Sequence, residues 1–202
     1  MQRRPERERR ADLINATILE IGAARSLDVT TVQIAKRAGV SSGLAFHYFK
    51  DKDSLFLAAM RAILSSYSDD VSRMMKSAQS PQDRLTAIAK ACFGASSLDR
   101  NTMSAWVVFY ALALKSSRAK RLLNVYQRRL HSNLVHNLRP LIGAQADPAA
   151  RRIAGLIDGL YLRCALESHA VVAFDGAAEV LQAIEAECQD TCLFAAPKTH
   201  AI

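Results

Sequence analysis

The chain has 202 residues, half of them hydrophobic, which is enough for a sizeable core and excludes wholesale disorder. Its formal net charge is +8, and residues 1–61 alone hold eleven Lys/Arg against seven Asp/Glu. Such an excess indicates a polyanionic partner, of which nucleic acid is the simplest, although a solvated basic surface has the same composition.

The composition predicts an all-α fold, because alanine is abundant, aromatic residues are few and no segment alternates with a period of two. The apolar patterns along the chain predict about nine helices. The longest apolar run, 105–114, is about half of the roughly 20 residues that a membrane span needs. The Arg-rich N-terminus has no apolar segment behind it, so we expect no signal peptide. Four scattered cysteines indicate reduced thiols, and we expect a cytoplasmic protein without a membrane partner.

Residues 1–10 carry five arginines and lead into a helix predicted from about Glu6 to Ala24. A basic arm of this kind can lie along DNA phosphates or enter a minor groove, and it can equally be a solvated chain end.

The stretch 30–55 contains two short helical patterns joined by a turn. Thr30 and Gln33 have the spacing of a capping box, which begins the first helix, and Gly39 ends it. Ser41 is a favourable N-cap for the second helix. Two short helices around a turn with glycine, in basic surroundings, are typical of a helix-turn-helix whose second helix enters a DNA major groove. The two helices are predicted over 32–38 and 42–49.

Longer helices follow, with N-caps predicted at Asp51, Ser80 and Asp175. The helix over 100–115 is apolar nearly all round, which indicates that it is central or lines a cavity. The helix over 117–142 has many basic residues and no acidic one; we interpret these as a solvated face, the alternative being a second DNA surface. These helices are predicted over 52–77, 81–97, 100–115, 117–142, 147–168 and onward from Asp175.

The last two of these helices have broad apolar stripes. Gly155 and Gly159 interrupt the first stripe, and small residues there let another helix approach closely. The pattern predicts a homodimer that pairs the two helices of each chain in a four-helix bundle.

The segment VSSGLAFHYFKDK at 40–52, with IAKRAG at 34–39 before it, closely resembles the signature of TetR-family repressors. This resemblance implies an all-helical homodimer with an N-terminal DNA-binding domain, here 1–52. It also implies a C-terminal ligand-sensing and dimerisation domain, here 53–196, which leaves 197–202 as a tail.

Three further segments resemble the BetI-type subgroup of that family: AWVVFY at 105–110, RLHSNL at 129–134 and LIDGLYLR at 156–163. Members of the subgroup repress the choline-to-glycine-betaine pathway and respond to choline. The resemblance therefore implies a repressor that choline releases from its operator. Phe46 stands where the wider family commonly has Tyr, and Tyr161 stands where the subgroup tends to have Trp.

In such a fold the second helix of the motif reads the major groove, and neighbouring helix starts hold phosphates. His47 is expected to contact a base or a phosphate, although it could be an ordinary surface residue. A two-fold dimer implies a palindromic operator in double-stranded DNA. Three residues of this helix are expected to pack inward: Ala45, Phe46 and Phe49. The expected DNA-binding residues are Thr30, Thr31, Ser42, Gly43, Leu44, His47, Tyr48 and Lys52.

A quaternary ammonium such as choline is recognised by aromatic faces together with a negative charge. The aromatic candidates could instead belong to the core, and Asp158 could pair with Arg163 or with an arginine of 117–142. The expected ligand-binding residues are Phe93, Trp106, Phe109, Tyr110, Asp158 and Tyr161.

Two other functions are compatible with parts of the sequence. The nearer is a TetR-type repressor that responds to another small cation or to a drug-like ligand. The more distant is an all-helical enzyme, but the sequence has no metal-ligand spacing and no glycine-rich phosphate loop. We therefore expect no cofactor, no metal and no catalytic residue.

Overall fold

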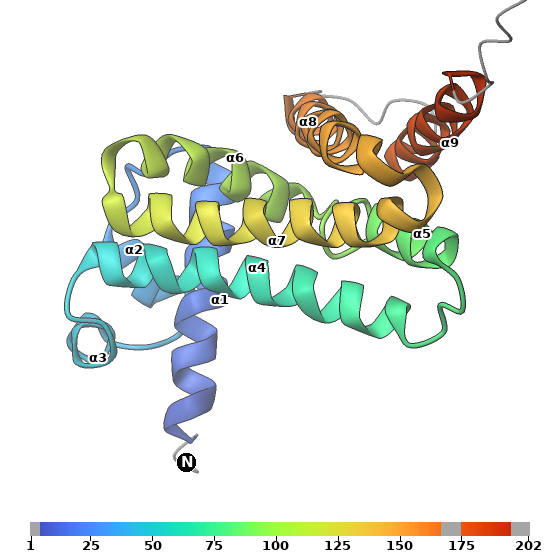
Figure 1. Ribbon diagram of the computed structural model, residues 1–202. Coiled ribbons are helices and arrows are strands. Elements are labelled where there is room, and N and C mark those ends of the chain that lie inside the picture. Colours follow the sequence, from blue (N-terminus) through green and yellow to red (C-terminus); the bar gives the residue numbers. More distant parts are fainter. Residues whose placement is uncertain (1–4, 167–174, 195–202) are drawn as a thin grey trace, which may run out of the picture. The chain divides into compact units, whose positions relative to one another are not determined.

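A computed structural model of the chain describes residues 5–166 and 175–194, and in this part every regular element is a helix (Figure 1). The predicted all-α fold is confirmed. The elements are α1 (Glu6–Ala24), α2 (Thr31–Arg37), α3 (Ser42–Tyr48), α4 (Lys52–Met75), α5 (Pro81–Cys92), α6 (Arg100–Lys115), α7 (Ser117–Ile142), η1 (Gly143–Gln145), α8 (Ala146–Leu166) and α9 (Gly176–Phe194).

Most helix boundaries lie within two residues of the predicted ones, and α5 is the exception. It ends at Cys92, five residues earlier than predicted, because Phe93 leaves the helical conformation with φ −117° and ψ 25°. The following Gly94, Ser96 and Ser97 favour turns over helix. The predicted tail at 197–202 and the first residues of the basic arm lie outside the described residues.

The chain divides into two compact units that do not follow chain order. Unit 1 comprises residues up to Asp69 together with 95–126, and unit 2 comprises 70–94 together with the residues from Gln127 onward. The helices α4 and α7 each contribute to both units. The predicted functional division at residue 52 concerns DNA binding and sensing, and it stays a prediction.

In unit 1, the most extensive helix contact joins α1 to α6, and α2 joins α1 to α3. The inward face of α1 carries Leu13 and Ile21, which are fully buried. Thr17 is also buried, and its hydroxyl donates to the carbonyl of Leu13 at 2.7 Å, so it adds no unpaired polar group to the core. The helix-turn-helix is thus linked to α6 through α1.

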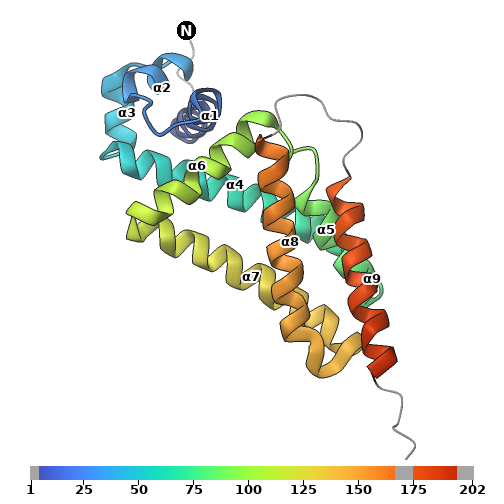
Figure 2. The same cartoon turned by 90° about the horizontal axis from the view of Figure 1, so that it is seen from above.

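In unit 2, both α5 and α8 pack against α9 (Figure 2). The guanidinium of Arg152 on α8 donates two hydrogen bonds of 2.5 Å to the carboxylate of Glu187 on α9. This hydrogen bonding lowers the pKa of Glu187 below its ordinary value. The α8–α9 pair is therefore held by a charged contact as well as by apolar packing.

Three predicted N-caps are confirmed. The backbone N–H of Ser54 donates to the Asp51 carboxylate at 2.6 Å, and the N–H of Ala178 donates to Asp175 at 3.1 Å. Ser80 forms a full capping box with Asp83, whose pKa is lowered by hydrogen bonds from Ser80 and from the Gln79 backbone. These caps set the starts of α4, α5 and α9.

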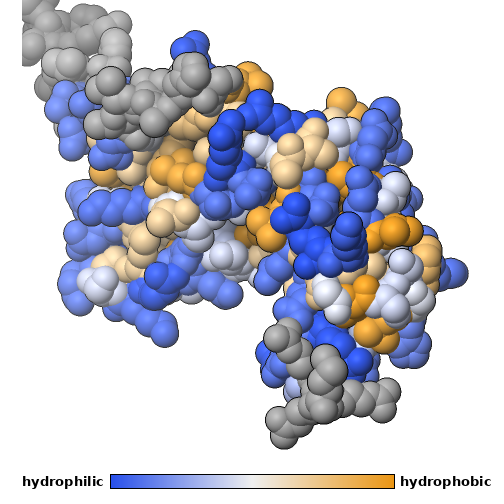
Figure 3. All heavy atoms as spheres, turned by 180° about the vertical axis from the view of Figure 1, so that it is seen from behind, coloured by the Kyte–Doolittle hydropathy of each residue, from blue (hydrophilic) through white to orange (hydrophobic). Residues whose placement is uncertain are grey.

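Hydrophobic residues on the rear face lie in separate patches between hydrophilic ones (Figure 3). None of the helices in the described part is long and apolar enough to cross a membrane. Among the cysteines, Cys92 is buried, and Cys164 and Cys188 are partly buried. The side chain of Cys192 lies outside the described residues.

Candidate DNA-binding and ligand sites

The turn between α2 and α3 has the geometry that its sequence predicts. Thr30 accepts a hydrogen bond from the Gln33 N–H at 3.2 Å, and the Gln33 side chain accepts one from the Thr30 N–H at 2.7 Å. At the other end of α2, Gly39 has φ +67°, a left-handed conformation that favours glycine.

A Schellman motif closes α2. The N–H of Gly39 donates to the carbonyl of Lys36 at 3.2 Å, and the N–H of Val40 donates to that of Ala35 at 3.0 Å. Ser41 then caps α3 by accepting from the N–H of Leu44 at 3.2 Å. The backbone between the two helices is thus fully specified by local hydrogen bonds.

The inward face of α3 is shorter than predicted. Ala45 and Phe49 are buried, as expected, with exposed fractions of 1% and 5%. The prediction for Phe46 was wrong, because its side chain is 55% exposed. Phe46 follows Ala45 by one residue, about 100° around the helix, and so turns away from the buried face. It lies beside His47 among the outward residues of α3.

The predicted DNA-binding residues all lie on the helix-turn-helix or at the start of α4. Thr30, Gly43 and His47 are exposed, and the remaining five are partly buried. A Cβ atom built on Gly43 meets nothing within 4 Å, so the backbone of α3 is open to close approach there. The His47 and Tyr48 rings meet edge to face at 5.4 Å. The partly buried members of the set are Thr31, Ser42, Leu44, Tyr48 and Lys52.

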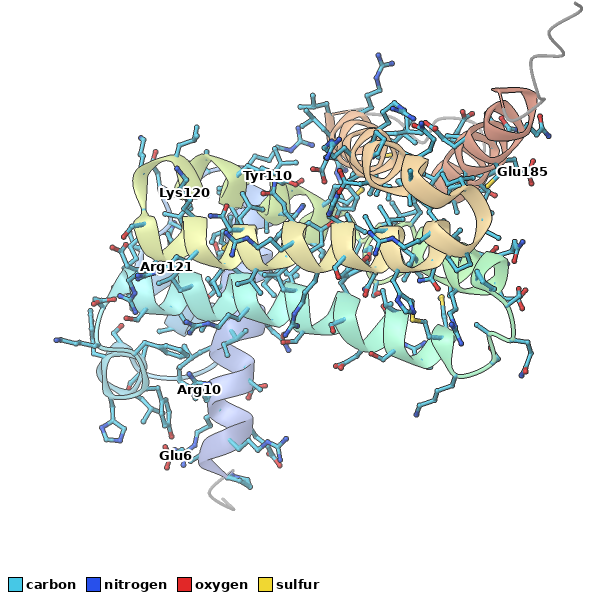
Figure 4. All side chains as sticks on the ribbon, in the orientation of Figure 1. Glu6, Arg10, Tyr110, Lys120, Arg121 and Glu185 are labelled. Carbon is cyan, nitrogen blue, oxygen red and sulfur yellow. The ribbon has the colours of Figure 1, made fainter. Side chains whose placement is uncertain are left out.

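Two cations lie over aromatic rings at the edges of this surface. The guanidinium of Arg10 on α1 stands 4.9 Å from the ring centre of Phe49, and the Lys52 ammonium stands 5.2 Å from that of Phe56. Figure 4 shows Arg10 on the side of α1 toward α3. Arg10 belongs to the basic arm of the sequence, and the structure brings it to the helix-turn-helix.

The second candidate site is a cluster of aromatic rings within unit 1. The rings meet edge to face. The ring centroid of Trp106 lies 5.5 Å from that of Tyr110 and 5.4 Å from that of Tyr126, and the centroids of Tyr126 and Tyr67 are 5.6 Å apart. Trp106 is only 6% exposed, whereas the three tyrosines are partly exposed. The cluster joins α4, α6 and α7, and it offers ring faces and hydroxyl groups around one indole.

The other predicted ligand-binding residues are placed differently. Phe109 is fully buried on α6 and serves the core of unit 1. Phe93, Asp158 and Tyr161 belong to unit 2, where Phe93 is buried and the other two are partly buried. The sequence pattern named Trp106 and Tyr110 as candidates but left Tyr67 out, because Tyr67 lies about forty residues earlier in a separate helix.

Two family models match the chain. The model of bacterial regulatory proteins of the tetR family matches residues 16–59, and the model of the BetI-type transcriptional repressor C-terminal domain matches residues 81–190. An HTH-type transcriptional regulator BetI from Brucella canis is 47% identical over 163 residues, which cover 80% of this chain and 82% of that protein. The chain belongs to the BetI-type transcriptional repressors of the TetR family.

Other relatives of this BetI-type repressor agree. The HTH-type transcriptional regulator BetI from Rhizobium meliloti is 42% identical, with 79% of each chain covered. A transcriptional regulator from Pseudomonas aeruginosa PAO1 superposes with a TM-score of 0.79 at 26% identity, covering 93% of this chain and 92% of that one.

One solved neighbour was determined with a ligand. A transcriptional regulator from Saccharomonospora viridis in complex with choline has a TM-score of 0.75 at 18% identity, over 91% of this chain and 97% of that one, and this likeness shows a shared fold.

TetR-family proteins are DNA-binding transcriptional regulators that respond to small molecules, not enzymes. In the described part of this BetI-type repressor, no group of three or more His, Cys, Asp or Glu side chains could hold a metal ion.

Proposed function

We propose that this BetI-type repressor controls genes of choline and glycine betaine metabolism, and that choline releases it from a palindromic operator. The observation that carries the proposal is the cluster of Trp106, Tyr110, Tyr126 and Tyr67 in a chain of this subgroup. A trimethylammonium group has no N–H to donate, so aromatic faces are its natural partners. The choline complex of a protein with the same fold is in keeping with this assignment.

On the DNA side, α3 would lie in the major groove. Its outward residues include His47, which can donate to a base or a phosphate, and Phe46, which can offer only apolar contact, for instance to a thymine methyl group. With few side chains able to read bases, much of the affinity would come from phosphate contacts, so operator binding should weaken steeply with salt. The protein would act in the cytoplasm, where its DNA is.

On the dimer side, α8 and α9 would pair with their copies in a second chain. The positions Gly155, Gly159, Leu162 and Leu166 are spaced four, three and four residues apart, and all four are exposed. They therefore form one outward stripe of small and apolar residues along α8. Cβ atoms built on the two glycines meet nothing within 4 Å, which leaves room for a second helix to approach.

The aromatic cluster would be coupled to the DNA-binding helices through two routes inside unit 1. Tyr67 lies on α4, whose first residues follow α3 directly. Trp106 lies on α6, which packs against α1. A ligand that shifts α6 or α4 relative to α7 would therefore also move the helices that present α3 to DNA.

Fluorescence tests ligand binding directly, because Trp106 is the only tryptophan of the chain. Choline bound at the cluster should change the intrinsic emission in a saturable way, whereas glycine betaine and a primary ammonium should have weaker effects. In Trp106→Leu the operator should still be bound and choline should no longer release it. Full release by choline in this variant would show that Trp106 is not part of the site. If another small cation, and not choline, releases the unmodified protein from its operator, the alternative inducer is supported.

A further inference from the structure

Four cations surround the turn between α6 and α7. Lys115, Arg118, Lys120 and Arg121 fall within seven residues, and all four side chains are exposed. No Asp or Glu occurs between residues 100 and 146, so no acidic residue of α6 or α7 offsets them. The sequence by itself favours a solvated face for these cations, and the structure adds their position.

The turn belongs to the same compact unit as the helix-turn-helix. Figures 1 and 2 both place it at the end of unit 1 where α4 begins. The pKa of Asp51 at that point is lowered chiefly by hydrogen bonds from Ser54, and additionally by the nearby charges of Arg118 and Lys50. Arg118 therefore lies within electrostatic reach of the residue that caps α4, one position before Lys52.

Ion pairs and the helix dipole do little to stabilise the three cations at the start of α7, Arg118, Lys120 and Arg121. The first turn of α7 contains no acidic residue, and cations at a helix N-terminus meet the positive end of the helix dipole. Among the described residues, no carboxylate lies within ion-pair distance of Lys115, Arg118, Lys120 or Arg121. An external polyanion would supply the missing opposite charge.

We infer that the α6–α7 turn is a second DNA contact, in which Arg118 and Arg121 meet backbone phosphates next to those held by the start of α4. Figure 4 shows Arg121 on the edge of α7 turned toward α4 and Lys120 on the other edge, so Arg121 is the one on the same side as the start of α4. Duplex DNA carries about one charge per 1.7 Å of axis, so a surface that continues past the helix-turn-helix meets further phosphates. The inference rests on DNA binding through α3.

The salt dependence of operator binding tests this contact, because the slope of log K against log salt concentration is proportional to the number of phosphates that the protein neutralises. Each phosphate that the protein no longer neutralises reduces the slope of log K against log salt concentration by about one. The double variant Arg118→Gln, Arg121→Gln should therefore have a slope smaller by about two, with equal weakening on operator and on unrelated duplex. The charge-preserving Arg118→Lys, Arg121→Lys should keep most of the slope.

The matched control is Arg128→Gln, Arg129→Gln. This pair removes the same charge from exposed positions of the same helix, in the part of α7 that belongs to unit 2. An unchanged slope in the Arg118/Arg121 variant would overturn the inference, and so would an equal reduction of slope in the control, which would indicate a general charge effect. Failure of the unmodified protein to bind any operator would instead refute binding through α3.

Discussion

Gly22 of α1 lies directly against the backbone of Asn101 near the start of α6. A Cβ atom on Gly22 would come within 2.3 Å of the Asn101 carbonyl oxygen and 2.6 Å of its Cα atom. Separations of this kind cannot be relieved by rotating a side chain, because the neighbour is backbone. The contact of α1 with α6 therefore depends on the absence of a side chain at residue 22.

Replacing Gly22 by Ala should destabilise the protein. Inside a helix, alanine normally stabilises the folded state by about 0.8–1 kcal/mol relative to glycine. Overpacking of this kind destabilises it by about 1–3 kcal/mol. We therefore expect the free energy of unfolding to fall. Thermal unfolding measures the change. Gly43→Ala is the control, because a Cβ there meets nothing within 4 Å, and it should leave the stability equal or higher. A stabilised Gly22→Ala variant would contradict the close contact.

Phe46 is exposed and Phe49 is buried, so substitutions of these two rings should affect operator binding and folding stability differently. Phe46→Ala should leave the melting temperature nearly unchanged, because the side chain is 55% exposed, and should weaken operator binding if the ring meets a base. Phe49→Ala removes a buried ring and should cost about 3–5 kcal/mol of stability. Unfolding curves and fluorescence anisotropy on labelled operator give the two quantities. A large drop in stability for Phe46→Ala would put the ring back in the core.

The ion pair between Arg152 and Glu187 makes a pH-dependent contribution to unfolding. The pKa of Glu187 is lowered in the folded state from its ordinary value of 4.5. The ion pair therefore stabilises the folded protein fully at pH values above 4.5, and this stabilisation is lost as the pH falls through the lowered pKa of Glu187. Glu187→Gln should thus be less stable than the unmodified protein at pH 7, by less than about 1 kcal/mol because Arg152 is well exposed. The difference should shrink as the pH falls below 4.5 and disappear once the pH lies below the lowered pKa of Glu187.

The control for this pair is Glu185→Gln on the exposed face of the same helix (Figure 4). It removes the same charge without touching Arg152 and should not change stability at pH 7. A difference between Glu187→Gln and the unmodified protein that does not shrink as the pH falls below 4.5 would contradict the assignment.

The proposed dimer can be tested at Gly159. Gly159 is exposed and a Cβ atom there meets nothing within 4 Å, so we expect Gly159→Leu to fold normally. In a four-helix interface the same side chain would stand where a partner helix approaches, and sedimentation should show a shift from dimer to monomer. A stable dimer in this variant would place the interface elsewhere.

Local signals in the sequence predicted the helix-turn-helix accurately, because its capping box, its Gly39 turn and its Ser41 cap act over three or four residues. The burial of single side chains on α3 was harder to predict. In a helix of seven residues the boundary of the buried face cannot be placed from the sequence to better than one position. Phe46 lies at this boundary, and it was predicted to be buried although it is exposed.

Only those contacts of the aromatic cluster that join residues close in sequence could be predicted from the sequence. Trp106 and Tyr110 are one helical turn apart and could be paired from spacing alone. Tyr67 and Tyr126 reach Trp106 only through the packing of α4 and α7 against α6. The close approach of Gly22 to Asn101 is likewise invisible in the sequence, where Gly22 is simply a glycine near the end of a helix.

The central claim is that choline releases this repressor from its operator, and one titration tests it. The protein is bound to a labelled palindromic fragment from upstream of the choline and glycine betaine genes, and choline is added while anisotropy and Trp106 emission are followed together. We predict that the anisotropy falls to that of free DNA over the same choline range in which the emission saturates. Anisotropy that stays at the bound value while choline rises to saturation would contradict the account.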